Sequence, residues 1–207
     1  MRRSFLARFM RALSKSSMDE ETRKAIAESM RRTLSLPRKH ANFFNSHNKE
    51  TKELAICAEF IQYLVDEYDQ LFDSIILGGD PPDCIAVSGE QNVAIEIVEL
   101  VDQVAIESQI CTKHAYPEQD PWTSQRLTDH LNKLIQQKDC PTEKEHLKRS
   151  YPRYIALIHT DEPELTVTDF DHLYVKEFIK STDLVSEVYL LFSYDPGVKG
   201  CPVRRLV

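Results

Sequence analysis

Apolar residues recur at helical spacing in two long segments of the chain. In residues 49–72 one face at 100° per residue carries Ile56, Cys57, Phe60, Ile61, Leu64, Tyr68 and Leu71. Residues 122–139 repeat the pattern with Leu127, Leu131, Leu134 and Ile135. A shorter helix is predicted within residues 166–182, and another within residues 19–35. The stretch 35–48 breaks the periodicity and is interpreted as a linker.

Between these helices the pattern predicts strands. Residues 73–80, 84–91 and 92–101 are short apolar segments, and the turn at Ser88-Gly89-Glu90 joins the last two into an antiparallel hairpin. Residues 151–160 and 185–195 contain continuous apolar runs, which are typical of strands covered on both faces. Residues 201–207 are interpreted as a last edge strand. The order helix, three strands, helix, strand, helix, strand predicts an α/β fold.

Three acidic side chains interrupt the apolar pattern. Asp83 opens the second strand after Pro81-Pro82, and Glu96 lies between Ile95 and Ile97 in the third. Glu53 falls at the centre of the apolar face of the 49–72 helix. Buried unpaired carboxylates are costly, so a cation or an ion pair is expected to compensate them. Hard ions such as Mg²⁺ and Mn²⁺ prefer clustered oxygen ligands, which makes these acids candidate metal ligands.

Each acid also has a simpler explanation. Pro-Pro-Asp is a common turn opener, so Asp83 alone carries little information. Glu53 could be an acid of the first helical turn, where the helix dipole favours it. Glu96 could lie on a solvent-exposed sheet face opposite Ile95 and Ile97, because successive strand residues point to opposite faces.

Charge is distributed unevenly along the 207 residues, whose formal net charge is −7. Residues 1–40 hold eleven Lys and Arg against four Asp and Glu, a balance of +7, and the remainder has a balance of −14. The basic stretch is either an arm for an anionic partner or a solvated helix. Residues 1–17 are rich in Arg and lack acids, which fits a transit peptide, a surface-binding helix or an upstream extension before Met18.

The cysteines and histidines argue against a zinc site. Five cysteines occur without a Cys-x-x-Cys pair, and the seven histidines show no His-x-x-x-His spacing. We therefore expect reduced thiols in a cytoplasmic protein. No apolar run approaches the roughly 18 residues that a membrane span needs.

The acids and the element order together resemble the PD-(D/E)XK nuclease superfamily. The resemblance rests on Pro82-Asp83, on Glu96-Ile97-Val98 and on the helix acid Glu53, in an αβββαβ order over about residues 49–160. It implies a restriction-endonuclease-like core with a mixed central sheet flanked by helices in residues 49–207. Residues 1–48 are interpreted, from their charge and periodicity, as a basic helical extension and linker. By position, Glu53, Asp83 and Glu96 would then hold Mg²⁺ or Mn²⁺.

The sequence departs from the superfamily pattern at Val98. The family's lysine belongs two residues after the acid, on the same face of the strand, where it positions or helps deprotonate the attacking water. Lys138, on the apolar side of the 122–139 helix, is one candidate replacement, and Gln125 near the start of that helix is another. The simpler explanation for Lys138 is that it is a C-terminal lysine favoured by the helix dipole. A β-bulge could also turn Glu99 toward the site.

Three functions are therefore compared. The first is a metal-dependent endonuclease that hydrolyses phosphodiester bonds in DNA, with Glu53, Asp83, Glu96 and Lys138 as catalytic residues. The second is an inactive member of the same fold that serves as a binding or regulatory subunit. The third is a membrane-surface or organelle protein addressed by residues 1–17. The expected partners are a nucleic acid, which we expect to be DNA, and a second copy of the chain in a homodimer.

Overall fold

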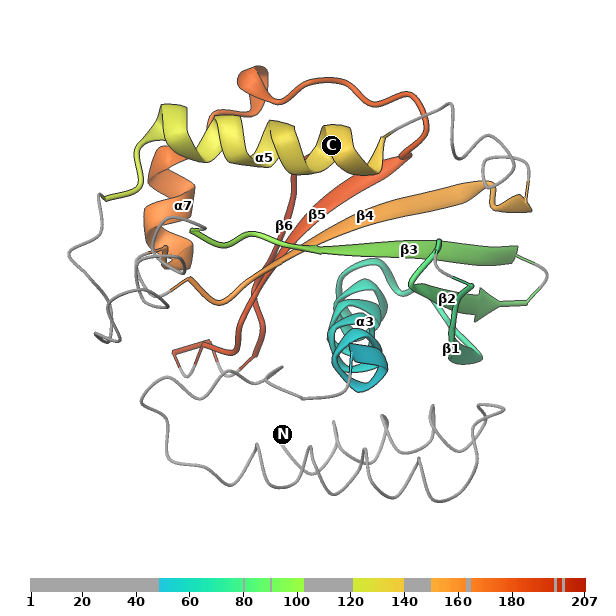
Figure 1. Ribbon diagram of the computed structural model, residues 1–207. Coiled ribbons are helices and arrows are strands. Elements are labelled where there is room, and N and C mark those ends of the chain that lie inside the picture. Colours follow the sequence, from blue (N-terminus) through green and yellow to red (C-terminus); the bar gives the residue numbers. More distant parts are fainter. Residues whose placement is uncertain are drawn as a thin grey trace.

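The fold is an α/β arrangement around one mixed sheet, seen in a computed structural model (Figure 1). The structure describes residues 49–79, 81–89, 91–102, 121–139, 150–162, 165–195, 197–198 and 200–207. The predicted helix at 19–35, the linker and the basic stretch 1–40 lie outside these residues. Within them the chain forms α3 (Lys49–Tyr68), β1 (Ser74–Leu77), β2 (Cys84–Ser88), β3 (Gln91–Glu99), α5 (Ser124–Lys138), β4 (Arg153–Thr160), α7 (Val167–Leu173), the 3₁₀ helix η1 (Lys176–Phe178), β5 (Glu187–Phe192) and β6 (Val203–Arg205).

The six strands lie in the sheet in chain order, from β1 to β6. β1, β2 and β3 form an antiparallel meander, so the predicted hairpin is confirmed. β3, β4 and β5 run parallel, and β6 closes the sheet as an antiparallel edge strand. Both parallel connections carry a helix, as a crossover between parallel strands requires.

Helices cover both faces of the sheet, with α3 on one side and α5 and α7 on the other (Figure 1). Alternate residues of β3 enter the two cores: Val93 and Ile95 pack with α3, and Ala94 and Val98 pack with α5 and α7. β4 and β5 are buried on both faces. The prediction from their continuous apolar runs is therefore confirmed.

Single residues at the helix ends determine where α5 begins and where α3 ends. Thr123 caps α5, with its side chain accepting a hydrogen bond from Arg126 N, so the helix begins after Trp122. α3 stops at Tyr68 rather than at residue 72, because Asp69 adopts a left-handed φ of 54°. Tyr68 and Leu71, predicted on the apolar face, are exposed at 42% and 77%.

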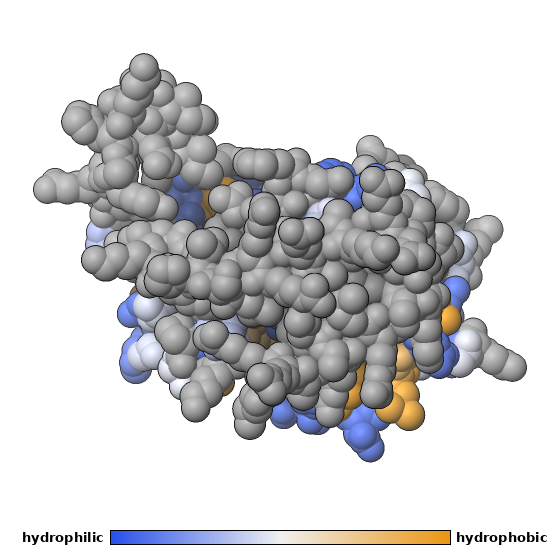
Figure 2. Space-filling model, turned by 90° about the horizontal axis from the view of Figure 1, so that it is seen from below, coloured by the Kyte–Doolittle hydropathy of each residue, from blue (hydrophilic) through white to orange (hydrophobic). Residues whose placement is uncertain are grey.

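The described surface is mixed in character. Among the described residues, no helix combines the length and the apolar composition needed to span a bilayer. Figure 2 shows the molecule from below, and the described side chains visible there include both hydrophilic and apolar areas. Of the cysteines, the structure describes Cys57, Cys84 and Cys201, and all three are free thiols, as expected.

Candidate functional site at the end of the β-hairpin

Glu96 lies in the middle of β3 and points into the α5 side of the sheet. Its side chain is only 4% exposed. Lys138 Nζ, from the last turn of α5, donates to Glu96 Oε1 at 2.8 Å, and Tyr154 Oη, from β4, donates to Oε2 at 3.2 Å. Burial, and then the Glu96 carboxylate, raise the pKa of Tyr154, so its phenol stays protonated and donates. The alternative of a solvent-exposed Glu96 is therefore wrong.

Asp83 caps the exposed edge of the same strand. The β2–β3 ladder begins at the pair Cys84 and Ile95, and β3 continues past it to Glu99. Ile97 N therefore faces the position just before β2, where it donates to Asp83 Oδ2 at 2.7 Å. The carboxylate takes the place of a backbone carbonyl in the ladder, which explains why an acid is tolerated with only 8% exposure.

Glu53 reaches the same place from the other face of the sheet. It lies one turn into α3, its side chain is 14% exposed, and Lys49 Nζ lies 3.4 Å from its Oε1. Burial, and then the nearby Asp83 carboxylate, raise the pKa of Glu53. Because β2 begins only after Asp83, the edge of β3 is not covered by a strand there, and Glu53 and Glu96 approach Asp83 from opposite faces of the sheet.

The carboxylates crowd one another, and two ammonium groups offset them in part. Burial raises the pKa of Asp83, the hydrogen bond from Ile97 opposes this, and Glu96 adds a further increase. Lys138 and Lys49 both act in the opposite direction on Asp83. Like charges held this close favour the arrival of a cation or a proton.

The side chains are of the chemical type that binds a divalent cation, but they are not arranged as a metal site. Carboxylates are the oxygen ligands that Mg²⁺ and Mn²⁺ prefer, and the pKa values of Glu53 and Asp83 are raised by burial first and by a neighbouring carboxylate in addition. However, in the parts of the chain that the structure describes, no three Asp, Glu, His or Cys side chains form a ready group for a metal ion. Internal donors already occupy both oxygens of Glu96 and one oxygen of Asp83.

The structure places the other predicted residues as follows. Val98 points to the same face as Glu96 and packs against the α5 core, so the family's lysine position is filled by an apolar side chain. Gln125 lies at the opposite end of α5 from Lys138, about 20 Å along the axis at ~1.5 Å per residue, and donates to Asp129. Of the two candidate replacements for the family's lysine, Lys138 therefore contacts Glu96 and Gln125 lies far from it.

The proposed bulge at Glu99 is also absent from β3. The β3–β4 register runs without interruption from Val93 to Glu99, so Glu99 points away from Glu96. Its carboxylate pairs with Lys52 Nζ at 2.9 Å. Glu99 belongs to a separate charged group at the carboxyl ends of β3 and β4.

In this second charged group the acidic side chains outnumber the basic ones. Glu99 lies opposite buried His159, whose Nδ1 is 3.9 Å from Oε1, and burial lowers the pKa of His159 to about 3, so the ring is neutral. Burial and Glu99 raise the pKa of Asp161. Nearby, Arg126 Nη2 donates to Asp102 at 2.5 Å, with its guanidinium over the Trp122 ring. This clamp fixes α5 to the end of β3.

Three contributors to the site were missed in the sequence. Tyr154 stands at the start of the apolar run of β4, and only the register of β4 against β3 brings its hydroxyl to Glu96. Asp139 accepts hydrogen bonds from backbone N–H groups of the segment before β5, and Ser186, at the end of that segment, bonds the backbone of Tyr154. Hydrogen bonds from single polar side chains to a distant backbone do not recur at a regular spacing, so the pattern of the sequence could not reveal them.

Comparison with protein-family models, curated proteins and solved structures finds no match to this chain.

Proposed function

We propose that the chain is a metal-dependent endonuclease of the PD-(D/E)XK type, acting on DNA. The observation that carries the proposal is the contact between Lys138 Nζ and Glu96 Oε1 at 2.8 Å. Val98 cannot supply the ammonium of the family pattern, and Lys138 brings one to the same acid from α5. The Asp83 carboxylate interacts with Glu96 on one side and with Glu53 on the other, which gives three acids in sequence around the end of the hairpin.

The topology supports the same proposal. A helix, an antiparallel three-stranded meander, a crossover helix and a parallel fourth strand follow one another as α3, β1–β3, α5 and β4. This is the αβββαβ order that the family resemblance implies. The acid of β3 and the acid before β2 lie beside each other, as the family motif requires.

In this proposal Glu53, Asp83 and Glu96 would hold Mg²⁺ or Mn²⁺. The metal would stabilise negative charge on the scissile phosphate and lower the pKa of a bound water. Lys138 keeps positive charge beside Glu96, where it would oppose the charge that develops on phosphate. Tyr154 fixes the second oxygen of Glu96. The basic stretch 1–40 would contact the phosphate backbone.

A second candidate is an inactive protein of the same fold that serves as a binding or regulatory subunit. The observation that favours it is that Lys138 and Tyr154 already satisfy both oxygens of Glu96. A stable ion pair in this place compensates the buried acid without any metal. This candidate predicts that the folded protein binds no divalent ion and cuts no DNA.

One experiment separates the two candidates. Supercoiled plasmid is incubated with the wild type, an Asp83→Ala/Glu96→Ala variant and an Asp129→Ala control, with Mg²⁺, Mn²⁺ or EDTA. Calorimetry measures metal binding on the same samples, with and without a DNA duplex. Asp129 is an exposed acid of α5, so its loss should change neither result. Metal-dependent nicking that only the double variant loses supports the endonuclease. A folded wild type that shows neither binding nor nicking supports the inactive subunit.

A further inference from the structure

We propose that Asp139 is the positioning residue of the candidate site. It docks the last turn of α5 on residues 183–186 and thereby places Lys138 on Glu96. The catalytic consequence rests on the proposed function, whereas the placement of Lys138 does not.

Asp139 follows Lys138 directly and is the C-cap of α5, where its own N–H bonds to Ile135 O. Its carboxylate accepts three backbone hydrogen bonds. Asp183 N donates to Oδ2 at 2.8 Å, Leu184 N donates to Oδ1 at 2.7 Å, and Val185 N donates to Oδ1 at 2.8 Å. Charge-assisted bonds of this kind are stronger than neutral ones, so the helix end is tied firmly to the segment before β5.

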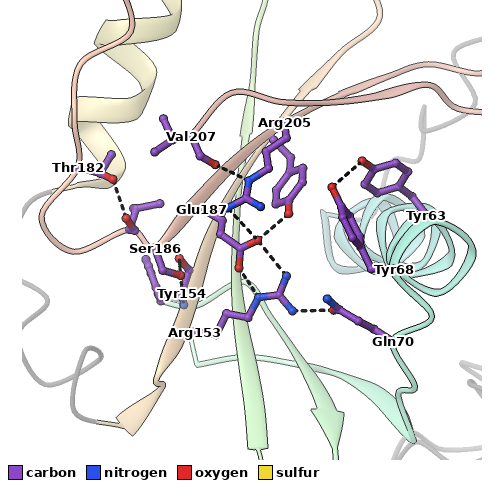
Figure 3. Close-up of polar contacts among 12 residues, drawn as sticks. Tyr63, Tyr68, Gln70, Arg153, Tyr154, Thr182, Ser186, Glu187, Arg205 and Val207 are labelled. Atoms are coloured by element: carbon purple, nitrogen blue, oxygen red, sulfur yellow. Dashed lines mark hydrogen bonds and ion pairs between the residues drawn. The ribbon is translucent and has the colours of Figure 1, made fainter. Parts of the chain in front are cut away.

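The same segment also holds Tyr154. Ser186 N and Ser186 Oγ both donate to Tyr154 O, at 2.8 and 2.9 Å, and Tyr154 N donates to Ser186 Oγ at 3.0 Å. Figure 3 shows Ser186 against Tyr154, with Thr182 closing the turn through Val185 O. Residues 183–186 therefore anchor both groups that donate to Glu96.

These contacts form a closed ring through four elements. It runs from Glu96 to Lys138, through Asp139 to the 183–186 segment, and through Ser186 and Tyr154 back to Glu96. A Lys side chain has many rotamers, so its fixed placement needs a fixed backbone. Preorganised donors of this kind are what an electrostatic site requires.

Asn132 offers a matched control on the same helix. Its Nδ2 donates to Phe178 O at 2.9 Å, and its Oδ1 accepts from Lys180 N at 2.9 Å. It therefore also ties α5 to the chain before β5, but nearly two turns away from Lys138. Loss of Asn132 should weaken the fold without releasing the site.

The test measures how fast Lys138 Nζ is acetylated by N-hydroxysuccinimide acetate under native conditions, with exposed Lys133 as internal reference. Peptide mass spectrometry gives the ratio of the two rates in the wild type, Asp139→Ala, Asp139→Asn and Asn132→Ala. We expect Asp139→Ala to raise the ratio about tenfold, the factor equivalent to ~1.4 kcal/mol of lost charge-assisted bonding. Asp139→Asn keeps one acceptor and should give a smaller rise, and it serves if the alanine variant does not fold.

The proposal is overturned if Asp139→Ala or Asp139→Asn leaves the ratio unchanged, or if Asn132→Ala raises it as much. Neither metal nor turnover enters this measurement. If the wild type neither binds metal nor cuts DNA, the endonuclease proposal fails while the acetylation ratio still decides the role of Asp139. If the wild type cuts DNA, Asp139→Ala should lower kcat about tenfold with KM little changed.

Discussion

Breaking the ion pair between Lys138 and Glu96 should destabilise the fold more than losing the pair altogether. The perturbation is Lys138→Met, which keeps the length and apolar stem of the side chain and removes its charge. Glu96 Oε1 then loses its 2.8 Å donor, while Oε2 keeps Tyr154. The carboxylate cannot turn to water, because its side chain is only 4% exposed.

The exposures of the two partners set the magnitude. Removing one member of a fully buried pair costs roughly 3–5 kcal/mol, since the other charge is left unpaired. Lys138 is 21% exposed, so water enters part of the space it leaves, and we expect about 2–3 kcal/mol. Glu96→Leu leaves a lysine that can reach solvent and should cost about 1–2 kcal/mol. The double variant should return to within about 1 kcal/mol of the wild type.

Urea unfolding provides the assay, followed by circular dichroism and by the fluorescence of Trp122, the single tryptophan of the chain. Lys133→Met is the control, because Lys133 is exposed on the same helix and its loss should cost less than ~0.5 kcal/mol. A double variant as unstable as Lys138→Met would refute the reasoning. So would a Lys138→Met variant that matches the control.

Two further predictions concern groups whose pKa the fold shifts. Burial raises the pKa of Asp83 in the folded protein, so its ionisation weakens the fold as the pH rises from about 3.8 through the raised folded value. Asp83→Asn should therefore stabilise the protein at pH 7 by about 0.5–1 kcal/mol, and it should remove any metal binding. An Asp83→Asn variant that is less stable than the wild type in urea unfolding would contradict this. Burial lowers the pKa of His159 from 6.5 to about 3, so protons bind the unfolded chain first and stability is lost as pH falls through this window. Between pH 8 and pH 5 the wild type should lose about 2 kcal/mol more than His159→Gln, and equal losses would show that His159 is charged in the folded protein.

The order of the helices and strands could be predicted from the sequence, because the spacing of apolar residues largely determines which element each segment forms. The strands at 84–91, 92–101 and 151–160 and the helix at 122–139 were expected within two or three residues of their observed bounds. The excess length predicted for the first helix has a local cause. Its apolar period extends to Leu71, but Asp69 turns left-handed and ends the helix at Tyr68. The positive φ of this one residue ends the helix although the apolar spacing continues, and the amino-acid composition of the segment does not reveal it.

The site was predictable where it depended on strand alternation and unpredictable where it depended on register. Alternation alone placed Glu96 and Val98 on one face. The choice between Lys138 and Gln125 required the position of α5 along β3, which depends on contacts between distant residues such as Arg126 and Asp102. Tyr154 required the parallel register between β3 and β4, in which its neighbour across the strands is Ala94. Long-range pairings of this kind leave no mark in the local sequence.

The position of the lysine shows why a missing motif residue need not mean a missing charge. What matters electrostatically is where the ammonium lies, and a Lys side chain can reach Glu96 either along β3 or down from the helix above it. α5 runs back over β3 from the clamp of Asp102 and Arg126 at one end, and Asp139 fixes its other end. The helix is thereby held at both ends, with Lys138 over Glu96. The same contact serves a nuclease as a positioned charge and an inactive fold as a permanent partner. Whether a divalent ion is drawn to the acids around Lys138 therefore distinguishes the two functions, since the contact itself is common to both.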